Sequence, residues 1–184
     1  PYDPTKLDDI YMYKRSPNVM TSLEFERILS AGGPTMGHLA RPSDDKEPEK
    51  IAWLQCIGSR DNNKCGNGYC SSVCCMYAVK DAMIAKEHSH KELDCAIFNM
   101  DMRTFGKDYE KYYIRARDEQ KVRFVKSRIH SIDEVRETGN LILTYADEAG
   151  KIQKEEFDMV VLSVGLVIPE ENRALARTIG VELD

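Results

Sequence analysis

The chain has 184 residues, of which 42% are hydrophobic and 31% charged, as is usual for one domain of a soluble globular protein. Its net charge of −5 offers no basic surface of the kind that binds nucleic acid. It contains no apolar run of the roughly 18 residues that span a membrane, and no secretory signal pattern. We therefore expect a cytoplasmic protein without a transmembrane segment. Because the chain begins with Pro1, we also expect a piece of a longer protein.

Residues 1–49 have the composition of a connector. Six of the seven prolines lie in this segment and leave little room for long regular elements. One short helix is expected, because Thr21 or Ser22 supplies an N-cap and Glu24 or Glu26 follows. We expect this helix to end at the run Gly32–Pro34.

The next segment begins with a strand, a glycine-containing loop and a helix. Lys50–Gln55 is almost continuously apolar, as a strand covered on both faces should be, and a helical pattern follows over Cys70–His88. Further strands are expected at Leu93–Asn99 and Val122–Val125, with an amphipathic helix at Asp108–Gln120 between them.

The hydrophobic pattern then changes to a period of two. Residues 141–157 alternate around an acidic, glycine-containing turn and predict a β-hairpin, which Arg128–Val135 precedes in extended form. Met159–Val164 is a further buried strand, and Glu171–Ile179 closes as a short helix before Gly180.

This order predicts an α/β fold. Right-handed crossovers would give a Rossmann-like parallel sheet with helices on both faces and an antiparallel β-hairpin as an appendage. The layout is typical of the nucleotide-binding half of flavoprotein reductases. We therefore predict a connector at 1–49, a Rossmann-like domain at 50–169, and a C-terminal helix at 170–184 that leads to a part outside this chain.

Five of the six cysteines fall between residues 56 and 75. In a reducing setting such a group more often binds metal or does redox chemistry than forms structural disulfides. Cys70 and Cys74 share one helix face if the helix has begun, but Cys75 is rotated by about 100° and fits a single tetrahedral ion poorly. An iron–sulfur cluster spreads its ligands over several irons, so Cys56, Cys70, Cys74 and Cys75 are a reasonable set for one. The positive end of the helix would face it.

Other interpretations of the cysteines stay open. Zinc, a redox-active disulfide and unliganded buried thiols are the alternatives to a cluster. Cys65 is ambiguous, since it is either a spare loop thiol or a replacement for one of the four. Cys95 lies inside an apolar strand and is expected to be a small buried hydrophobic residue.

A nicotinamide nucleotide is the other ligand that the fold suggests. Where a dinucleotide fingerprint would have G-x-G-x-x-G, this chain has Cys56-Ile57-Gly58-Ser59, so NAD(P)H is the less favoured alternative. Candidate cofactor contacts are Gly58, Ser59, Arg60 and Gly165. Arg60 and Arg103 are candidates to contact a phosphate or a cluster, although a solvated surface role is the favoured interpretation for each.

The chain also resembles a known family. The runs LQCIGSRD, YCSSVCCMYAVKDA, NVMTSLEFERILSAGGPT, MDMRTFGKDYEKYY and VVLSVGL are similar to the A-type, iron–sulfur flavoprotein subunit of heterodisulfide reductase and to related subunits of the quinone-interacting membrane-bound oxidoreductase. The resemblance covers nearly the whole chain. It implies a thioredoxin-reductase-like core with FAD, and a [4Fe–4S] cluster held by one cysteine, a gap and C-x3-C-C. That pattern matches Cys56, Cys70, Cys74 and Cys75 and leaves Cys65 out.

The resemblance further implies an oxidoreductase fragment that passes electrons between FAD and the cluster. FAD would be bound mostly by a part of the protein outside this chain, and no catalytic residue is assigned within it. The implied partners are other reductase or hydrogenase subunits and ferredoxin-type electron carriers, and a homodimer is a further option. The alternative is a non-catalytic Rossmann-like assembly domain with structural zinc or free thiols, or an NAD(P)H-binding domain.

Overall fold

A parallel sheet is the centre of the computed structural model, which describes residues 1–183. Within those residues the sheet has five strands in the order β1-β8-β2-β3-β4, and every neighbouring pair is parallel. Their apolar sequences suit strands that are covered on both faces. The strands are β1 (Val19–Thr21), β2 (Lys50–Ile57), β3 (Asp94–Asn99), β4 (Arg123–Lys126) and β8 (Met159–Val164).

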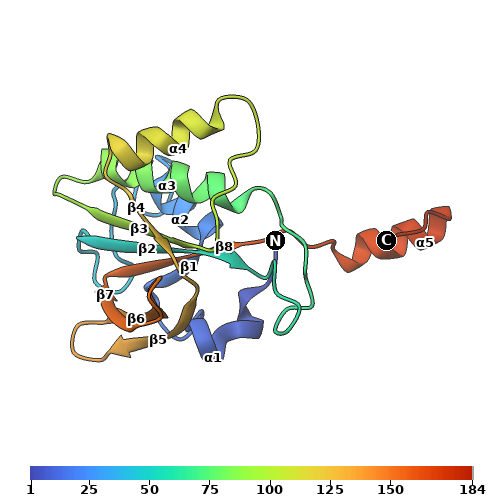
Figure 1. The fold of residues 1–184 in the computed structure, drawn as a ribbon, viewed down its shortest axis with the longest axis horizontal. Coiled ribbons are helices and arrows are strands. Elements are labelled where there is room, and N and C mark those ends of the chain that lie inside the picture. Colours follow the sequence, from blue (N-terminus) through green and yellow to red (C-terminus); the bar gives the residue numbers. More distant parts are fainter. Residues whose placement is uncertain (184) are drawn as a thin grey trace.

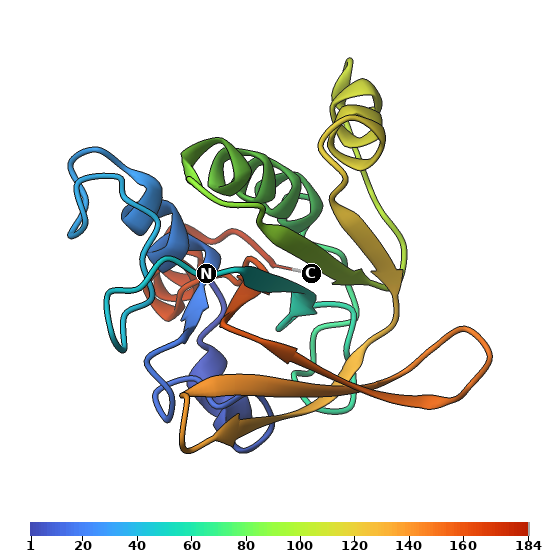
Figure 2. The ribbon, with the colours of Figure 1, turned by 90° about the vertical axis from the view of Figure 1, so that its left-hand side faces the viewer.

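Helices cover one face of this sheet (Figure 2). They are α2 (Ser22–Leu29), α3 (Cys74–His88) and α4 (Tyr109–Asp118). Their apolar sides form one core with the strand residues that point toward them. The Phe25 and Trp53 rings meet edge to face there, with centroids 5.4 Å apart, which joins α2 to β2.

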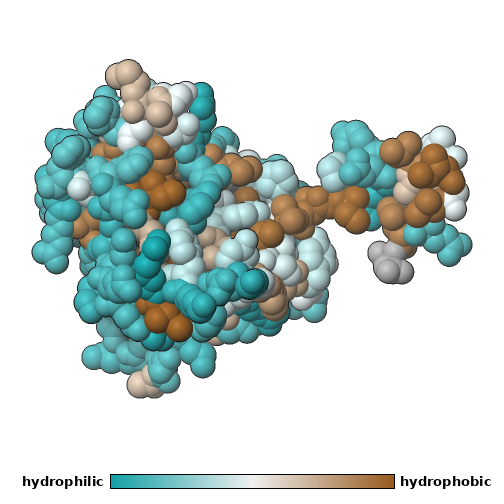
Figure 3. Space-filling model, turned by 90° about the horizontal axis from the view of Figure 1, so that it is seen from above, coloured by the Kyte–Doolittle hydropathy of each residue, from teal (hydrophilic) through white to brown (hydrophobic). Residues whose placement is uncertain are grey.

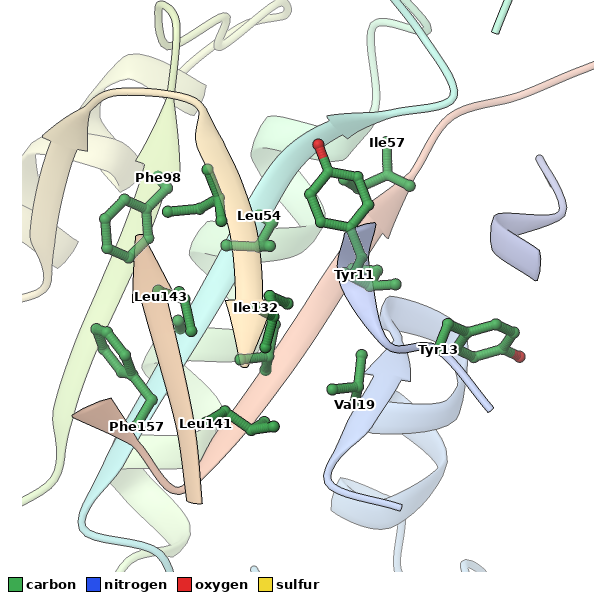
Figure 4. Packing of buried hydrophobic residues seen from close by; sticks show 14 of the residues in the cluster. Tyr11, Tyr13, Val19, Leu54, Ile57, Phe98, Ile132, Leu141, Leu143 and Phe157 are labelled. Carbon is green, nitrogen blue, oxygen red and sulfur yellow. The ribbon is translucent and has the colours of Figure 1, made fainter. Parts of the chain in front are cut away.

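The opposite face is covered by a second sheet rather than by helices. In the described part of the chain it is antiparallel, in the order β5-β6-β7, and consists of β5 (Ile129–Val135), β6 (Asn140–Ala146) and β7 (Ile152–Phe157). Leu141, Leu143 and Phe157 point from it into a core shared with Leu54 and Phe98 (Figure 4). The Rossmann-like fold is confirmed, but the expectation of helices on both faces is wrong. The alternating hairpin buries its apolar side against the main sheet and takes that place.

The N-terminal segment is part of this body. A 3₁₀ helix η1 (Pro4–Leu7) and helix α1 (Asp8–Tyr11) place Tyr2, Leu7, Tyr11 and Tyr13 in the core beside the second sheet. β1 pairs with β8 as the edge strand of the main sheet. The structure therefore differs from the expected connector, because elements too short to be stable alone dock by tertiary packing. The expected N-cap is confirmed at Thr21, which forms a capping box with Glu24.

The C-terminal helix α5 (Glu170–Ile179) extends away from the two sheets (Figure 1). It ends at Gly180, whose φ of +73° is in the left-handed region typical of a C-terminal glycine. The linking segment and the helix expose the apolar side chains Leu166, Ile168, Leu175 and Ile179. Figure 3 shows this hydrophobic surface along the projecting arm. No helix within residues 1–183 combines the length and apolar character that crossing a membrane requires.

Candidate metal centre

Four of the six cysteines, Cys56, Cys70, Cys74 and Cys75, lie where parallel strands end and α3 begins. β2 ends at Ile57, β3 ends at Asn99, and the loop of residues 58–73 leads from β2 into α3. The carboxyl ends of parallel strands meet at one edge of a sheet, and α/β folds place their sites there. The segments that carry the cysteines are thus brought to one corner of the fold by its topology.

Cys56 is placed by an irregularity in β2. The pairing of β2 with β8 shifts register between Leu54 and Ile57, and Cys56 lies in that interval with a φ of +61°. Residues with a Cβ rarely adopt this left-handed conformation, and such strain is concentrated at functional sites. The bulge redirects the Cys56 side chain, which is 6% exposed.

Cys70 lies outside α3, whose first residues are Cys74 and Cys75. The expectation that the helix begins at Cys70 is wrong, because Ser72 turns the chain with a φ of +63°. The Ser72 backbone N–H donates to Cys70 Sγ at 3.4 Å. Cys70 therefore reaches the site from a loop and not through a four-residue helical spacing.

The four predicted ligands are neighbours. Burial raises the pKa of the Cys74 thiol to about 12, and Coulomb repulsion from Cys56, Cys75 and Cys70 adds to this. Burial likewise raises the pKa of Cys75, with contributions from Cys56 and Cys70, and it raises the pKa of Cys56, with a contribution from Cys70. Within residues 1–183, no three His, Cys, Asp or Glu side chains converge closely enough to hold one metal ion. The thiols thus lie near one another without meeting at a single point.

Asp101, just beyond β3, links the cysteines to two arginines. Its backbone oxygen lies 4.0 Å from Cys75 Sγ. Its carboxylate accepts from Arg60 and from Arg103, whose Nε lies 3.2 Å away. Partial burial opposes ionisation, but the hydrogen bonds from Arg103 and Arg60 hold the pKa of Asp101 below its usual range. Sequence reasoning missed Asp101, because nothing local marks an acidic residue after a strand as the partner of the distant Arg60.

The other two cysteines lie elsewhere. Cys65 packs against the core beside the second sheet. Burial of Tyr2 raises the pKa of its hydroxyl group, and the neighbouring Cys65 raises this pKa further. Cys95 is fully buried in β3, with Sγ 3.8 Å from the Ala82 backbone oxygen. Burial raises the pKa of Cys95 to about 12. Its expected role as a small hydrophobic residue agrees with this position.

Three of the predicted nucleotide contacts, Gly58, Ser59 and Gly165, lie in a tightly packed part of the fold. A Cβ on Gly58 would overlap the Tyr2 ring, and one on Gly165 would lie 2.6 Å from Ser71 Oγ. Ser59 is fully buried, and its Oγ lacks a hydrogen-bond partner in the described part of the chain. The two glycines allow Tyr2 and the loop after β2 to approach closely. Contact of Gly58, Ser59, Arg60 or Gly165 with a nucleotide stays a prediction.

Asp81 is a buried acid that sequence reasoning also missed. It lies two turns after Cys74 on α3, and its side chain is fully buried. Neither carboxylate oxygen accepts a hydrogen bond from the residues that the structure describes, and Lys80 Nζ, which also pairs with Glu26, is 3.9 Å away. Burial raises the pKa of Asp81 to about 7, against the opposing effect of Lys80. The signal in the sequence was an acidic residue among the apolar residues of the buried helix face.

Comparison with known proteins places the chain within a longer polypeptide. It is 45% identical over 178 residues to the A-type iron–sulfur subunit of the CoB–CoM heterodisulfide reductase of Methanocaldococcus jannaschii, covering 96% of this chain and 27% of that protein. It is 47% identical over 166 residues to the second such subunit of Methanopyrus kandleri, covering 90% and 25%. It is 44% identical over 182 residues to the A-type subunit of the H2/formate:CoB–CoM heterodisulfide,ferredoxin reductase of Methanococcus maripaludis, covering 98% and 27%. The chain thus spans about a quarter of the length of these curated relatives.

Two further comparisons add little. No protein-family model matches the chain. The solved structure of the lysine monooxygenase NbtG from Nocardia farcinica aligns with 91% of this chain and 43% of its own, at 12% identity and a TM-score of 0.42.

Proposed function

Because this chain is homologous to about a quarter of the A-type iron–sulfur subunit of heterodisulfide reductase, we propose that it is the cluster-binding part of an iron–sulfur flavoprotein. In this proposal Cys56, Cys70, Cys74 and Cys75 hold a [4Fe–4S] cluster. The chain then serves as an electron-transfer module between that cluster and FAD, within a larger oxidoreductase.

The observation that carries the proposal is the proximity of these four thiols. Cys56 lies at the end of β2, Cys74 and Cys75 begin α3, and Cys70 lies in the loop that joins β2 to α3. Four thiolates are the ligand set of iron–sulfur clusters, which distribute them over several irons. A zinc ion needs all four sulfurs about 2.3 Å from one point, which the adjacent Cys74 and Cys75 make difficult.

The surrounding protein suits such a ligand set. Cys74 and Cys75 form the start of a 15-residue helix, whose positive end favours negative charge. Cys56, Cys74 and Cys75 are buried, so the protein excludes water from most of the site, whereas Cys70 is half-buried. A bound cluster would supply one-electron redox chemistry there. A thiol whose pKa burial has raised becomes a thiolate ligand only beside a cation.

The flavin and the protein partners belong to the same proposal. We assign most FAD contacts to parts of the longer protein outside this chain, with the exposed side chains of Leu166 and Ile168 and helix α5 leading toward them. The relative from Methanococcus maripaludis is named as part of a heterodisulfide,ferredoxin reductase. We accordingly propose ferredoxin-type carriers and other reductase subunits as partners.

Metal analysis under anaerobic conditions tests the proposal. The purified, reconstituted chain should contain about four irons and four sulfides, with an EPR signal after reduction. Cys74→Ser should abolish both. Cys65→Ser is the matched control, since it also replaces a loop-region thiol but should leave iron content unchanged. One zinc and no iron in the wild-type chain, or full iron content in Cys74→Ser, would contradict the ligand assignment.

A further inference from the structure

Two guanidinium groups are held beside the candidate ligands by one carboxylate. Asp101 accepts from Arg60 Nη2 at 3.3 Å and from Arg103 Nε and Nη2 at 3.2 and 3.3 Å. The backbone oxygen of Asp101 lies 4.0 Å from Cys75 Sγ. Arg60, Arg103 and Asp101 together carry a net charge of +1, and this charge lies next to the cysteines.

Arg60 is held in this position by its backbone as well as by its side chain. Its N–H donates to the Tyr69 carbonyl oxygen at 2.9 Å, and its φ is +54°, in the left-handed region. A residue with a Cβ rarely adopts this conformation unless the surrounding structure imposes it. Only 20% of the Arg60 side chain is exposed, so it is not a freely solvated surface arginine.

The two arginines approach the candidate ligands from different segments. Arg60 lies four residues after Cys56, and its side chain donates to the carboxylate of Asp101, whose backbone oxygen lies 4.0 Å from Cys75 Sγ. Arg103 donates to the same carboxylate from the segment after β3. The side chains of Arg103 and Asp101 are 35% and 46% exposed, and ion pairs with such exposure contribute little to stability. The arrangement is therefore better explained by its effect on the cysteines than by its effect on the fold.

Resting on the function proposed above, we propose that Arg60 and Arg103, held by Asp101, raise the reduction potential of the cluster bound by Cys56, Cys70, Cys74 and Cys75. Reduction adds one negative charge to the cluster. Positive charge and hydrogen bonds at its sulfur ligands stabilise that more negative state. The arginines are positioning residues, which act through the ligand sulfurs and through the charge around them.

An anaerobic redox titration followed by EPR tests this inference on the reconstituted chain. Arg60→Gln and Arg103→Gln should each disfavour reduction of the cluster at least tenfold. For a one-electron couple, this lowers the reduction potential by about 59 mV. Arg60→Lys keeps the charge and should restore part of the shift. Arg136→Gln, in the exposed turn between β5 and β6, removes the same charge and should leave the potential unchanged.

The outcomes separate the inference from the proposed function. Full iron content with an unchanged potential in both glutamine variants would overturn the inference alone. Loss of iron from both variants would show that the arginines hold the ligand loop together, and would also overturn it. A wild-type chain that binds no iron would instead overturn the proposed function, and the inference with it.

Discussion

The backbone oxygen of Asp101 lies 4.0 Å from Cys75 Sγ, so the segment after β3 is in contact with the first turn of α3. The same residue binds Arg60, which follows the strand that carries Cys56. The candidate centre is therefore built from three parts of the chain, namely the end of β2, the start of α3 and the segment after β3. Its geometry depends on the packing of the whole sheet edge.

The first prediction concerns the roles of the buried cysteines. Cys56→Ser and Cys75→Ser should lose the iron and the EPR signal. Cys95→Ser should keep both and lose about 1–3 kcal/mol of unfolding free energy, because it buries a hydroxyl group in an apolar core. Iron analysis and urea denaturation measure the two effects. A Cys95→Ser variant without iron would contradict the separation of Cys95 from the ligand set.

The second prediction is a pH dependence of stability from Asp81. Its pKa is raised from 3.8 to about 7 in the folded chain, so its stabilising contribution is fully present below about pH 4 and is lost as the pH rises toward 7. The loss amounts to at most about 4 kcal/mol. Asp81→Asn has no such ionisation, so its stability relative to the wild type should increase between pH 4 and pH 7.

Urea denaturation at pH 5 and pH 8 measures this difference. Asp133→Asn, at an exposed position on β5, is the matched control and should follow the wild type at both pH values. If Asp81→Asn and the wild type show the same pH dependence, the carboxylate ionises in the folded chain as readily as in the unfolded one.

The third prediction concerns Gly58, which permits the approach of Tyr2. Gly58→Ala should cost about 2–4 kcal/mol, because the new Cβ overlaps the Tyr2 ring and the φ of +75° is unfavourable for alanine. Gly150→Ala is the control, since its φ is +79° but nothing lies within 4 Å of the added Cβ. It should cost only about 1 kcal/mol. Equal losses in the two variants would show that Tyr2 does not restrict position 58.

The fourth prediction tests the capping box of α2. Thr21→Ala removes the acceptor of the Glu24 backbone N–H and should cost about 1 kcal/mol in unfolding free energy. Iron content should stay unchanged, because α2 carries none of the proposed ligands. Thr178→Ala, on the exposed helix α5, should change stability by no more than about 0.5 kcal/mol. A Thr21→Ala variant as stable as the wild type would contradict the role of this cap.

Much of the fold follows from patterns that are local in the sequence. The apolar runs of β2 and β8, the alternation in β6 and the cap at Thr21 were predicted correctly, because strand period, helix period and capping depend on residues close together in the chain. The choice of Cys56, Cys70, Cys74 and Cys75 also comes from the sequence, through their spacing and the resemblance to a family. Their role as ligands remains a proposal.

Other features were decided only by the tertiary structure. β1 is an edge strand because it pairs with β8, which lies far along the chain, and the hairpin covers a face expected to carry helices because its buried side fits there. The start of α3 at Cys74 depends on a left-handed turn at Ser72 that no residue type announces. Arg60 and Asp101 are 41 residues apart and meet only at the sheet edge. Contacts between such distant residues have no signature in a single sequence, because they form only when the sheet brings the strand ends together.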